Sequence, residues 1–96
     1  MAYRYEFREA AARDLAKLTR HNSALLLAIT VEHIPAILND PYGAGEAKKG
    51  DLAGLRAYNL KVANVAYRLV YEIVGDVVRF VAIGPHDDAY ARAKRR

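Results

Sequence analysis

The chain has 96 residues, 53% of them apolar, and this combination predicts one compact domain spanning residues 1–96. Lysine and arginine outnumber aspartate and glutamate by 15 to 11, and the resulting net charge of +4 moderately favours a polyanionic partner. The sequence contains no cysteine, which excludes disulfides, zinc–thiolate sites and thiol nucleophiles and agrees with a reducing cytoplasm. No apolar run is long enough to span a bilayer and the first residues lack a signal-peptide core, so we expect a cytoplasmic protein without a membrane partner.

The first third of the sequence predicts a strand followed by a helix. Aromatic and charged residues alternate over residues 3–7, which is the pattern of a half-buried strand. From Glu9 the apolar residues recur with a helical period, and we expect this helix to end between residues 19 and 21. Its apolar face is formed by Ala11, Leu15 and Leu18. The charged residues Arg13, Asp14 and Lys17 lie elsewhere on the helix.

A second helix and a loop are predicted next. Asn22 or Ser23 provides a helix cap, and an apolar stripe follows over residues 25–38. Pro35 lies inside this stripe and predicts a kink or an early end, because proline removes a backbone hydrogen bond. Residues 39–54 are rich in glycine and charge, which predicts a loop.

From Leu55 onward the sequence predicts a three-stranded antiparallel meander. Gly75-Asp76 suits the two central positions of a type II′ hairpin turn. This turn sets one register for the last two strands. On the apolar face of the sheet, this register pairs Ile73 with Val78, Tyr71 with Phe80 and Leu69 with Ala82. On the other face it pairs Glu72 with Arg79, Val70 with Val81 and Arg68 with Ile83. We expect Glu72 and Arg79 to form a structural ion pair.

The preceding hairpin brings two cations together. A two-residue loop at Asn64-Val65 pairs Lys61 with Arg68 on the outer face, beside Asn59. Like charges at such positions repel by roughly 0.2–1 kcal/mol, so an anion such as RNA phosphate is the natural bridge between them. The outer face of the sheet is expected to be concave or open to solvent.

A short helix is expected to end the domain. Gly84-Pro85 makes a turn, the acidic residues after His86 suit the start of a helix, and the basic residues near Arg96 suit its end. His86 then lies just beyond the strand that flanks Arg68, and Tyr90 lies one helical turn further on the same side. The predicted class is therefore α+β: a strand, a two-helix hairpin, a meander and a short terminal helix.

Three segments carry a family resemblance that covers nearly the whole chain. They are Leu52-Ala53-Gly54-Leu55-Arg56-Ala57-Tyr58, Tyr67-Arg68-Leu69-Val70-Tyr71 and Ile83-Gly84-Pro85-His86-Asp87-Asp88-Ala89-Tyr90. In this order and spacing the chain resembles the RelE/ParE toxin superfamily of bacterial toxin–antitoxin systems. The resemblance implies a ribosome-dependent endoribonuclease that cuts mRNA without a metal or other cofactor, by attack of a ribose 2′-hydroxyl on the adjacent phosphate.

The resemblance also implies roles for four residues. Lys61 matches a lysine that acts as base or charge stabiliser, and Arg68 matches an arginine that clamps the phosphate. His86 stands where many members have arginine, and because histidine titrates near neutral pH it is a better candidate for a proton donor. Tyr90 lies near the tyrosine that stacks on or orients the ribose. Asn59 stands where some members have a second lysine, so the cationic cluster has one positive charge fewer.

The expected partners follow from the same resemblance. They are an acidic antitoxin, the 70S ribosome and mRNA, with operator DNA bound through the antitoxin in a hetero-oligomer. Phosphate contacts are made largely by lysine and arginine, and we expect RNA binding at Asn59, Lys48, Lys49, Arg56, Arg92, Lys94 and Arg95. His21 and His33 have no partner at ligand spacing, so no metal site is expected.

Two alternatives remain open at this stage. ParE-like members poison DNA gyrase and do not need the ribonucleolytic residues, and the asparagine at position 59 keeps this alternative open. A non-catalytic relative that only binds an antitoxin is the other. Lys61, Arg68, His86 and Tyr90 together favour the nuclease.

Overall fold

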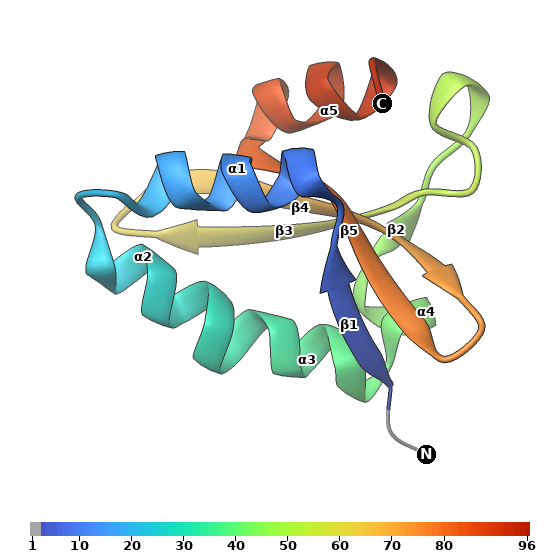
Figure 1. The fold of residues 1–96 in the computed structure, drawn as a ribbon, viewed down its shortest axis with the longest axis horizontal. Coiled ribbons are helices and arrows are strands. Elements are labelled where there is room, and N and C mark those ends of the chain that lie inside the picture. Colours follow the sequence, from blue (N-terminus) through green and yellow to red (C-terminus); the bar gives the residue numbers. More distant parts are fainter. Residues whose placement is uncertain (1–2) are drawn as a thin grey trace.

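A five-stranded sheet forms the centre of the computed structural model, which describes residues 3–96 (Figure 1). Its strand order is β1-β5-β4-β3-β2, with β1 parallel to β5 and every other neighbouring pair antiparallel. The strands are β1 (Arg4–Phe7), β2 (Glu46–Ala47), β3 (Arg56–Val62), β4 (Val65–Val74) and β5 (Val77–Pro85). The predicted α+β class and meander are confirmed, and the first strand extends the meander by joining its β5 edge.

The helices follow the predicted order. They are α1 (Glu9–Thr19), α2 (Ser23–Leu27), a π-helical segment η1 (Ala28–His33), α3 (Ile34–Asn39), α4 (Pro41–Ala44) and α5 (His86–Lys94). The side chain of Asn22 caps α2 by accepting a hydrogen bond from the Leu25 amide at 3.0 Å. The π-helical turn lies immediately before Pro35, where the missing amide hydrogen perturbs the helical hydrogen-bond pattern.

The segment predicted as a loop, residues 39–54, contains short elements. Besides α4 it forms β2, which pairs with β3, and a 3-10 turn η2 (Gly50–Leu52). Asp40 caps α4 by accepting a hydrogen bond from the Gly43 amide at 3.1 Å. The prediction of a plain loop was wrong because four-residue helices and two-residue strands are too short to show a period.

The register of the last hairpin agrees with the prediction near its turn and then departs from it. Gly75 has the positive φ of 62° that the turn requires, and the pairs from Val74–Val77 to Tyr71–Phe80 are as expected. Beyond this point a β-bulge leaves Val81 without a partner, so that Val70 pairs with Ala82 and Arg68 with Gly84. Three predicted pairs are therefore wrong by one residue: Leu69–Ala82, Val70–Val81 and Arg68–Ile83. Leu69 pairs instead with Ile83.

The preceding hairpin has a different turn from the one predicted. Ala63 and Asn64 occupy its two central positions with φ of 51° and 67°, as in a type I′ turn. The register therefore shifts by two residues relative to the prediction, which keeps every side chain on its predicted face. Lys61 pairs with Ala66, and Asn59 pairs with Arg68.

Two apolar clusters hold the sheet between layers of helix. On one face, α1 and the helical segment from α2 to α3 cover a cluster of fully buried side chains that includes Tyr71 and Phe80. Each such side chain stabilises the fold by about 1.5–3 kcal/mol through burial. A smaller cluster lies beneath α5 and is formed by Leu52, Val70, Ala82, Ala89 and Ala93. The sheet face predicted to be open is thus covered by α5 along part of its length.

Within residues 3–96, no helix combines the length and the apolar character that crossing a membrane requires.

Candidate functional site

Arg68 lies at the centre of the candidate site and is only 4% exposed. It comes from β4, directly opposite Asn59 of β3, and its Nε donates a hydrogen bond to Asn59 Oδ1 at 2.7 Å. Its other nitrogens contact the carbonyl oxygen of His86 at 3.4 Å and the Nε2 atom of the same residue. β3, β4 and the start of α5 therefore fix the guanidinium together.

The charge of Arg68 is not balanced by a carboxylate. Within residues 3–96, Arg68 forms no salt bridge to aspartate or glutamate, although a buried cation normally requires such a partner. The aromatic ring of Tyr90 takes part of this role, with its centroid 3.7 Å from the guanidinium carbon. The site thus holds a desolvated positive charge next to neutral groups.

His86 occupies the first position of α5, just beyond β5, as predicted. The prediction of a turn at Gly84-Pro85 was wrong, because both residues belong to β5 and pair with Arg68 and Tyr67. An arginine can only donate hydrogen bonds, so the contact with Arg68 makes His86 Nε2 an acceptor. The other ring nitrogen, Nδ1, lies 3.0 Å from Asp87 Oδ1. The imidazole side chain remains 47% exposed, so it is accessible to a ligand.

Lys61 lies beside this group but not opposite Arg68. It is exposed and lines a shallow cavity of about 420 Å³ together with Asn59, Leu60, Ala66 and His86. The predicted cross-strand pair of cations is wrong, because the Ala63-Asn64 turn moves Lys61 two positions along the sheet. The structure still brings Lys61 and His86 to one cavity, with Arg68 hydrogen-bonded to two of the residues that line it.

Tyr90 contacts two cations with its ring. Besides Arg68, the Nζ atom of Lys48 lies 4.9 Å from the ring centroid. Lys48 also faces Glu46 at 3.8 Å. The Tyr90 hydroxyl is buried and has no hydrogen-bond partner within residues 3–96, so it retains an unused donor and acceptor.

The other residues predicted to bind RNA are dispersed. Arg56 stacks on Tyr42 at 5.6 Å and donates a hydrogen bond to the Tyr42 carbonyl oxygen, at the opposite end of β3 from Lys61. Lys49 is exposed in the segment between β2 and η2. Arg92, Lys94 and Arg95 belong to α5 or follow it, and Arg92 donates to the Ile83 carbonyl oxygen at 3.0 Å.

Sequence reasoning missed the residue that anchors α5. Asp14 of α1 was expected away from the apolar face, but it is 7% exposed and receives hydrogen bonds from Arg96 at 2.6 Å and from the Ile83 amide at 3.1 Å. Arg92 lies 3.4 Å from the same carboxylate. Asp14 thus joins α1, β5 and the α5 segment that carries His86 and Tyr90. A lone acid in an amphipathic helix gave no signal of this role, because its partners lie about eighty residues later.

The electrostatics of this anchor follow from its contacts. Burial alone would raise the pKa of Asp14, but the hydrogen bonds from Arg96 and Ile83 and the charges of Arg96 and Arg92 outweigh it, so the pKa lies below the usual 3.8. The same contact with Asp14 raises the pKa of Arg96 above its ordinary value. The ionised pair is therefore the folded form at neutral pH.

One further prediction about charged residues is confirmed. Glu72 and Arg79 form the predicted ion pair at 3.5 Å, and each has an additional partner in Arg8 and Glu6. His33 is structural, since its Nδ1 lies 2.8 Å from the Tyr58 hydroxyl. Burial and the charge of Glu32 raise the pKa of Tyr58, which keeps this phenol protonated.

Several solved structures share this fold, and some of them are described as bacterial toxins. The free E. coli toxin RelE, in a mutant form, is 27% identical, with a TM-score of 0.66 over 100% of this chain and 98% of that one. The toxin–antitoxin complex RelBE2 from Mycobacterium tuberculosis contains a chain that is 23% identical, with a TM-score of 0.70 over 90% of this chain and 100% of its own. YafQ from E. coli is 20% identical, with a TM-score of 0.56 over 90% and 96% of the two chains. No curated protein sequence matches the chain.

A family model covers almost the whole sequence. Residues 6–94 match the model described as the ParE-like toxin of type II bacterial toxin–antitoxin systems. The match includes every residue of the Arg68 site and the whole of α5. The chain therefore belongs to the ParE-like toxin family of type II toxin–antitoxin systems, within the RelE/ParE superfamily that its sequence resembles.

Proposed function

We propose that this toxin is a ribosome-dependent endoribonuclease that cleaves mRNA. The observation that carries the proposal is the buried, carboxylate-free Arg68, which contacts His86 beside a cavity that also contains Lys61. A cation left without an acidic partner favours a ligand that brings its own negative charge, and RNA phosphate meets this requirement.

The proposed reaction is an internal transesterification. The ribose 2′-oxygen attacks the adjacent phosphorus, the bond from phosphorus to the 5′-oxygen breaks, and the products are a 2′,3′-cyclic phosphate and a 5′-hydroxyl. One proton leaves the 2′-hydroxyl and one is gained by the departing 5′-oxygen, so the balance closes without a cofactor. The protein has to supply a base, an acid and stabilisation of the charged transition state.

The side chains at the cavity are suited to these tasks. Lys61 is exposed and provides a mobile cation or base on one side of the cavity. His86 is the candidate for proton transfer to the leaving oxygen; it must first take up a proton at Nε2, the atom that Arg68 contacts. Arg68 supplies fixed positive charge, and its contacts with Asn59 and Tyr90 leave it little freedom to move. Tyr90 holds the Arg68 guanidinium in place with its ring, and its hydroxyl is buried.

The proposed partners extend those of the solved relatives. Two similar structures are described as toxin–antitoxin complexes, RelBE2 of Mycobacterium tuberculosis and RelBE of E. coli, which supports an antitoxin partner here. The net charge of +4 favours an acidic one. We extend the proposal to operator DNA bound through the antitoxin and to action on cytoplasmic 70S ribosomes.

The test is an mRNA cleavage assay with purified toxin and translating ribosomes. The natural chain should produce cuts phased with codons, and the variants Lys61→Ala and Arg68→Ala should each slow cleavage by at least about a hundredfold, as loss of a preorganised charge does. Arg4→Ala is the matched control, because Arg4 is an exposed arginine that pairs only with exposed Asp76 among residues 3–96. Intact mRNA with the natural chain would remove the proposal.

A second candidate function is inhibition of DNA gyrase. It is favoured by the description of the matching family model as ParE-like and by the burial of Arg68, which limits direct contact of its guanidinium with a substrate. A supercoiling assay with purified gyrase separates the two functions, since a gyrase inhibitor leaves mRNA intact. Inhibition that persists in Lys61→Ala and Arg68→Ala would favour this alternative.

A further inference from the structure

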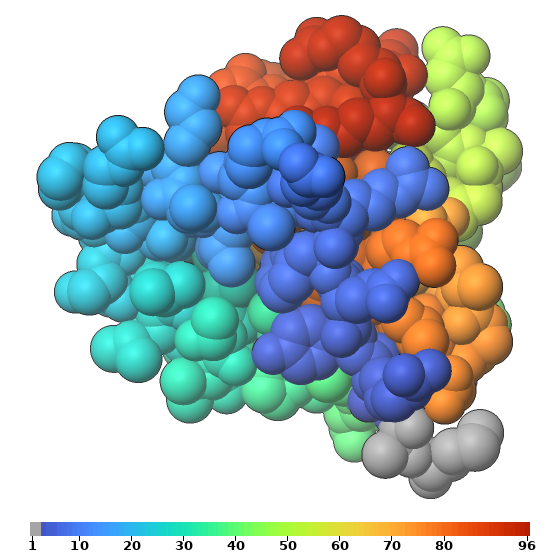
Figure 2. Space-filling model, viewed as in Figure 1, coloured from blue at the N-terminus to red at the C-terminus, as the bar shows by residue number. Residues whose placement is uncertain are grey.

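A second basic region lies on the other side of α5 from Tyr90, in a cleft of about 530 Å³ between α1 and α5. Figures 1 and 2 show α1 and α5 side by side on one face of the molecule. Arg13 and Lys17 line the cleft from α1, whereas Arg92, Arg95 and Arg96 line it from α5 and the residues that follow. Residues separated by about eighty positions thus form one surface.

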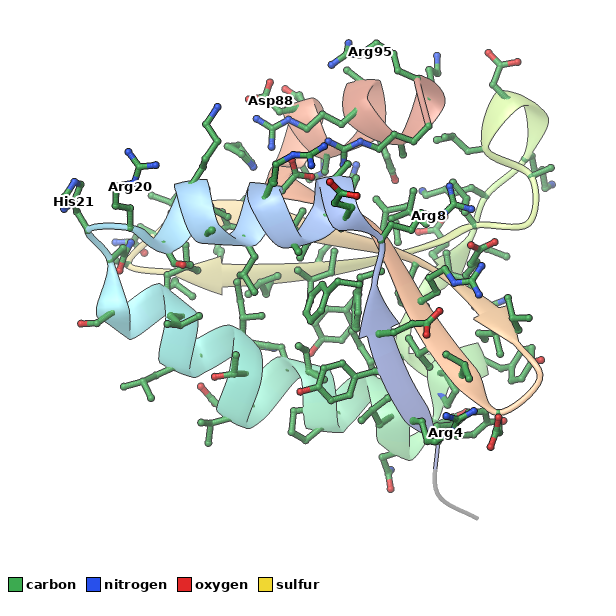
Figure 3. The ribbon with its side chains drawn as sticks, in the orientation of Figure 1. Arg4, Arg8, Arg20, His21, Asp88 and Arg95 are labelled. Carbon is green, nitrogen blue, oxygen red and sulfur yellow. The ribbon has the colours of Figure 1, made fainter. Side chains whose placement is uncertain are left out.

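The charge of the chain is concentrated in this cleft. Its lining contains five cationic side chains and two carboxylates, Asp14 and Asp88, and Arg13 also pairs with Glu9 at 2.8 Å, which leaves a formal excess of two positive charges. The whole chain has a net charge of +4, so half of that excess is located here. Figure 3 shows Asp88 of α5 and Arg95, which follows α5, above α1. Arg20 and His21 lie at the far end of α1, and Arg4 lies on the opposite side of the molecule.

The acid within the cleft does not neutralise its outer cations. Asp14 is saturated by Arg96, Arg92 and the Ile83 amide, and it is 7% exposed. Lys17 and Arg95 are exposed and form no salt bridge with any residue from 3 to 96. Their positive charges are therefore free to bind an anion from solution.

We propose that the α1–α5 cleft binds the phosphodiester backbone of a nucleic acid, which is RNA if the proposed function is correct. Cationic side chains projecting from two adjacent helices suit a chain of repeated negative charges better than a single small anion. Guanidinium groups contact phosphate oxygens with two donors at once, and four of the five cations are arginines. The cleft would hold the backbone while Arg68, His86 and Lys61 act at another point of the same strand.

The experiment measures binding without cleavage. The probe is a fluorescent RNA hairpin with 2′-O-methyl groups throughout, which has no free 2′-hydroxyl to react, and affinity is followed by anisotropy over a range of salt concentrations. The test variant is Lys17→Gln with Arg95→Gln. The matched control is Arg4→Gln with Arg20→Gln, which removes the same charge from outside the cleft. Thermal unfolding of both variants verifies that they fold.

We expect the test variant to bind the RNA hairpin at least about tenfold more weakly than the control, since each lost contact to a charged group is worth a similar factor. The slope of log affinity against log salt concentration should fall by about 1.4–1.8, or roughly 0.7 for each contact to a single strand and 0.9 for each contact to a duplex. A DNA hairpin of the same sequence tests whether the cleft prefers RNA or DNA. Tighter binding of RNA supports RNA as the ligand, and tighter binding of DNA overturns that assignment.

Two results would overturn the proposal. The first is equal affinity and equal salt dependence of the test variant and the control. The second is binding of a glutamate decapeptide as tight as that of RNA and equally weakened in the test variant, which would assign the cleft to an acidic protein segment. Neither result depends on catalysis, so a failure of the mRNA cleavage assay remains distinguishable from a failure of this inference.

Discussion

Asp14 of α1 receives two hydrogen bonds from the guanidinium of Arg96, at 2.6 Å and 3.0 Å, across 82 positions of sequence. The same carboxylate accepts the amide hydrogen of Ile83, so one side chain joins α1, β5 and the segment after α5. Because α5 carries His86 and Tyr90, the position of the candidate site depends on this contact between the first helix and the end of the fold.

Replacing Asp14 by alanine should therefore destabilise the fold by about 2–3 kcal/mol, because Arg96 and the Ile83 amide lose their buried partner. The measurement is the free energy of unfolding in urea. Asp88→Ala is the control: Asp88 lines the same cleft but is exposed, and its loss should change stability by no more than about 0.5 kcal/mol. Equal effects of the two substitutions would contradict the anchoring role of Asp14.

The same carboxylate predicts a dependence of stability on pH. Its pKa in the folded chain lies below the usual 3.8, so its contribution is fully present above that value and is lost as the pH falls through the folded pKa. The difference in unfolding free energy between the natural chain and Asp14→Asn should stay constant above about pH 5 and shrink below it. A difference that stays the same down to about pH 2 would show that the charge of Asp14 contributes nothing.

Asn59→Asp should separate stability from activity. The new carboxylate would face Arg68 Nε, which lies 2.7 Å from the present amide oxygen, and would give the buried cation the acidic partner that it lacks. We expect a gain in stability of about 0.5–1 kcal/mol and a loss of mRNA cleavage, since the charge offered to phosphate is neutralised. Asn64→Asp adds the same charge in the β3–β4 turn and is the control. Undiminished cleavage by Asn59→Asp would argue against a role for the Arg68 charge.

His86→Gln tests proton transfer. Glutamine preserves hydrogen bonding to Arg68 but cannot act as a general acid, so cleavage should slow by about a hundredfold or more. The single-turnover rate of mRNA cleavage is the measurement. His21→Gln, in an exposed position just after α1, should keep the natural rate. A natural rate in His86→Gln would leave His86 without a catalytic role.

Ala63→Gly should stabilise the chain. Ala63 has a φ of 51°, a left-handed conformation that disfavours residues with a Cβ atom, so glycine should relieve strain and add about 0.5–1 kcal/mol after its entropic cost. Ala53→Gly is the control, because Ala53 has an ordinary φ of −56° and the same substitution there should destabilise by about 0.5 kcal/mol. Thermal unfolding of both variants measures the contrast, and a destabilised Ala63→Gly would contradict it.

The turn at Ala63 also explains why the starting hypothesis about Lys61 and Arg68 was wrong. Alanine carries no turn signal, so Asn64 was assigned to the first central position rather than to the second. A register shift of two residues leaves the alternation of apolar residues unchanged, so this alternation could not reveal the wrong pairing of Lys61 with Arg68. The inward and outward faces of β3 and β4 were predictable from the sequence, but the neighbours along their outward face were not.

The other parts of the site differ in how far they were predictable. The proximity of His86 to Arg68 follows from chain order, since α5 begins where β5 ends beside β4. The β-bulge at Val81 was not predictable, because valine is an ordinary strand residue and the bulge depends on packing from both faces. The burial of Arg68 also depends on long-range packing, through three alanines, Ala82, Ala89 and Ala93, that let α5 lie against the sheet.

The side chains around Asp14 have one more consequence. β1 leaves the edge of β5 after the pair Phe7–Phe80. The backbone groups of β5 that β1 no longer pairs are bonded by side chains: Arg96 to the Val81 carbonyl, Asp14 to the Ile83 amide and Arg92 to the Ile83 carbonyl. An uncovered strand edge is a template for pairing with another polypeptide. Three charged side chains thus make hydrogen bonds to β5 where β1 no longer pairs with it, and they protect the sheet from self-association at this edge.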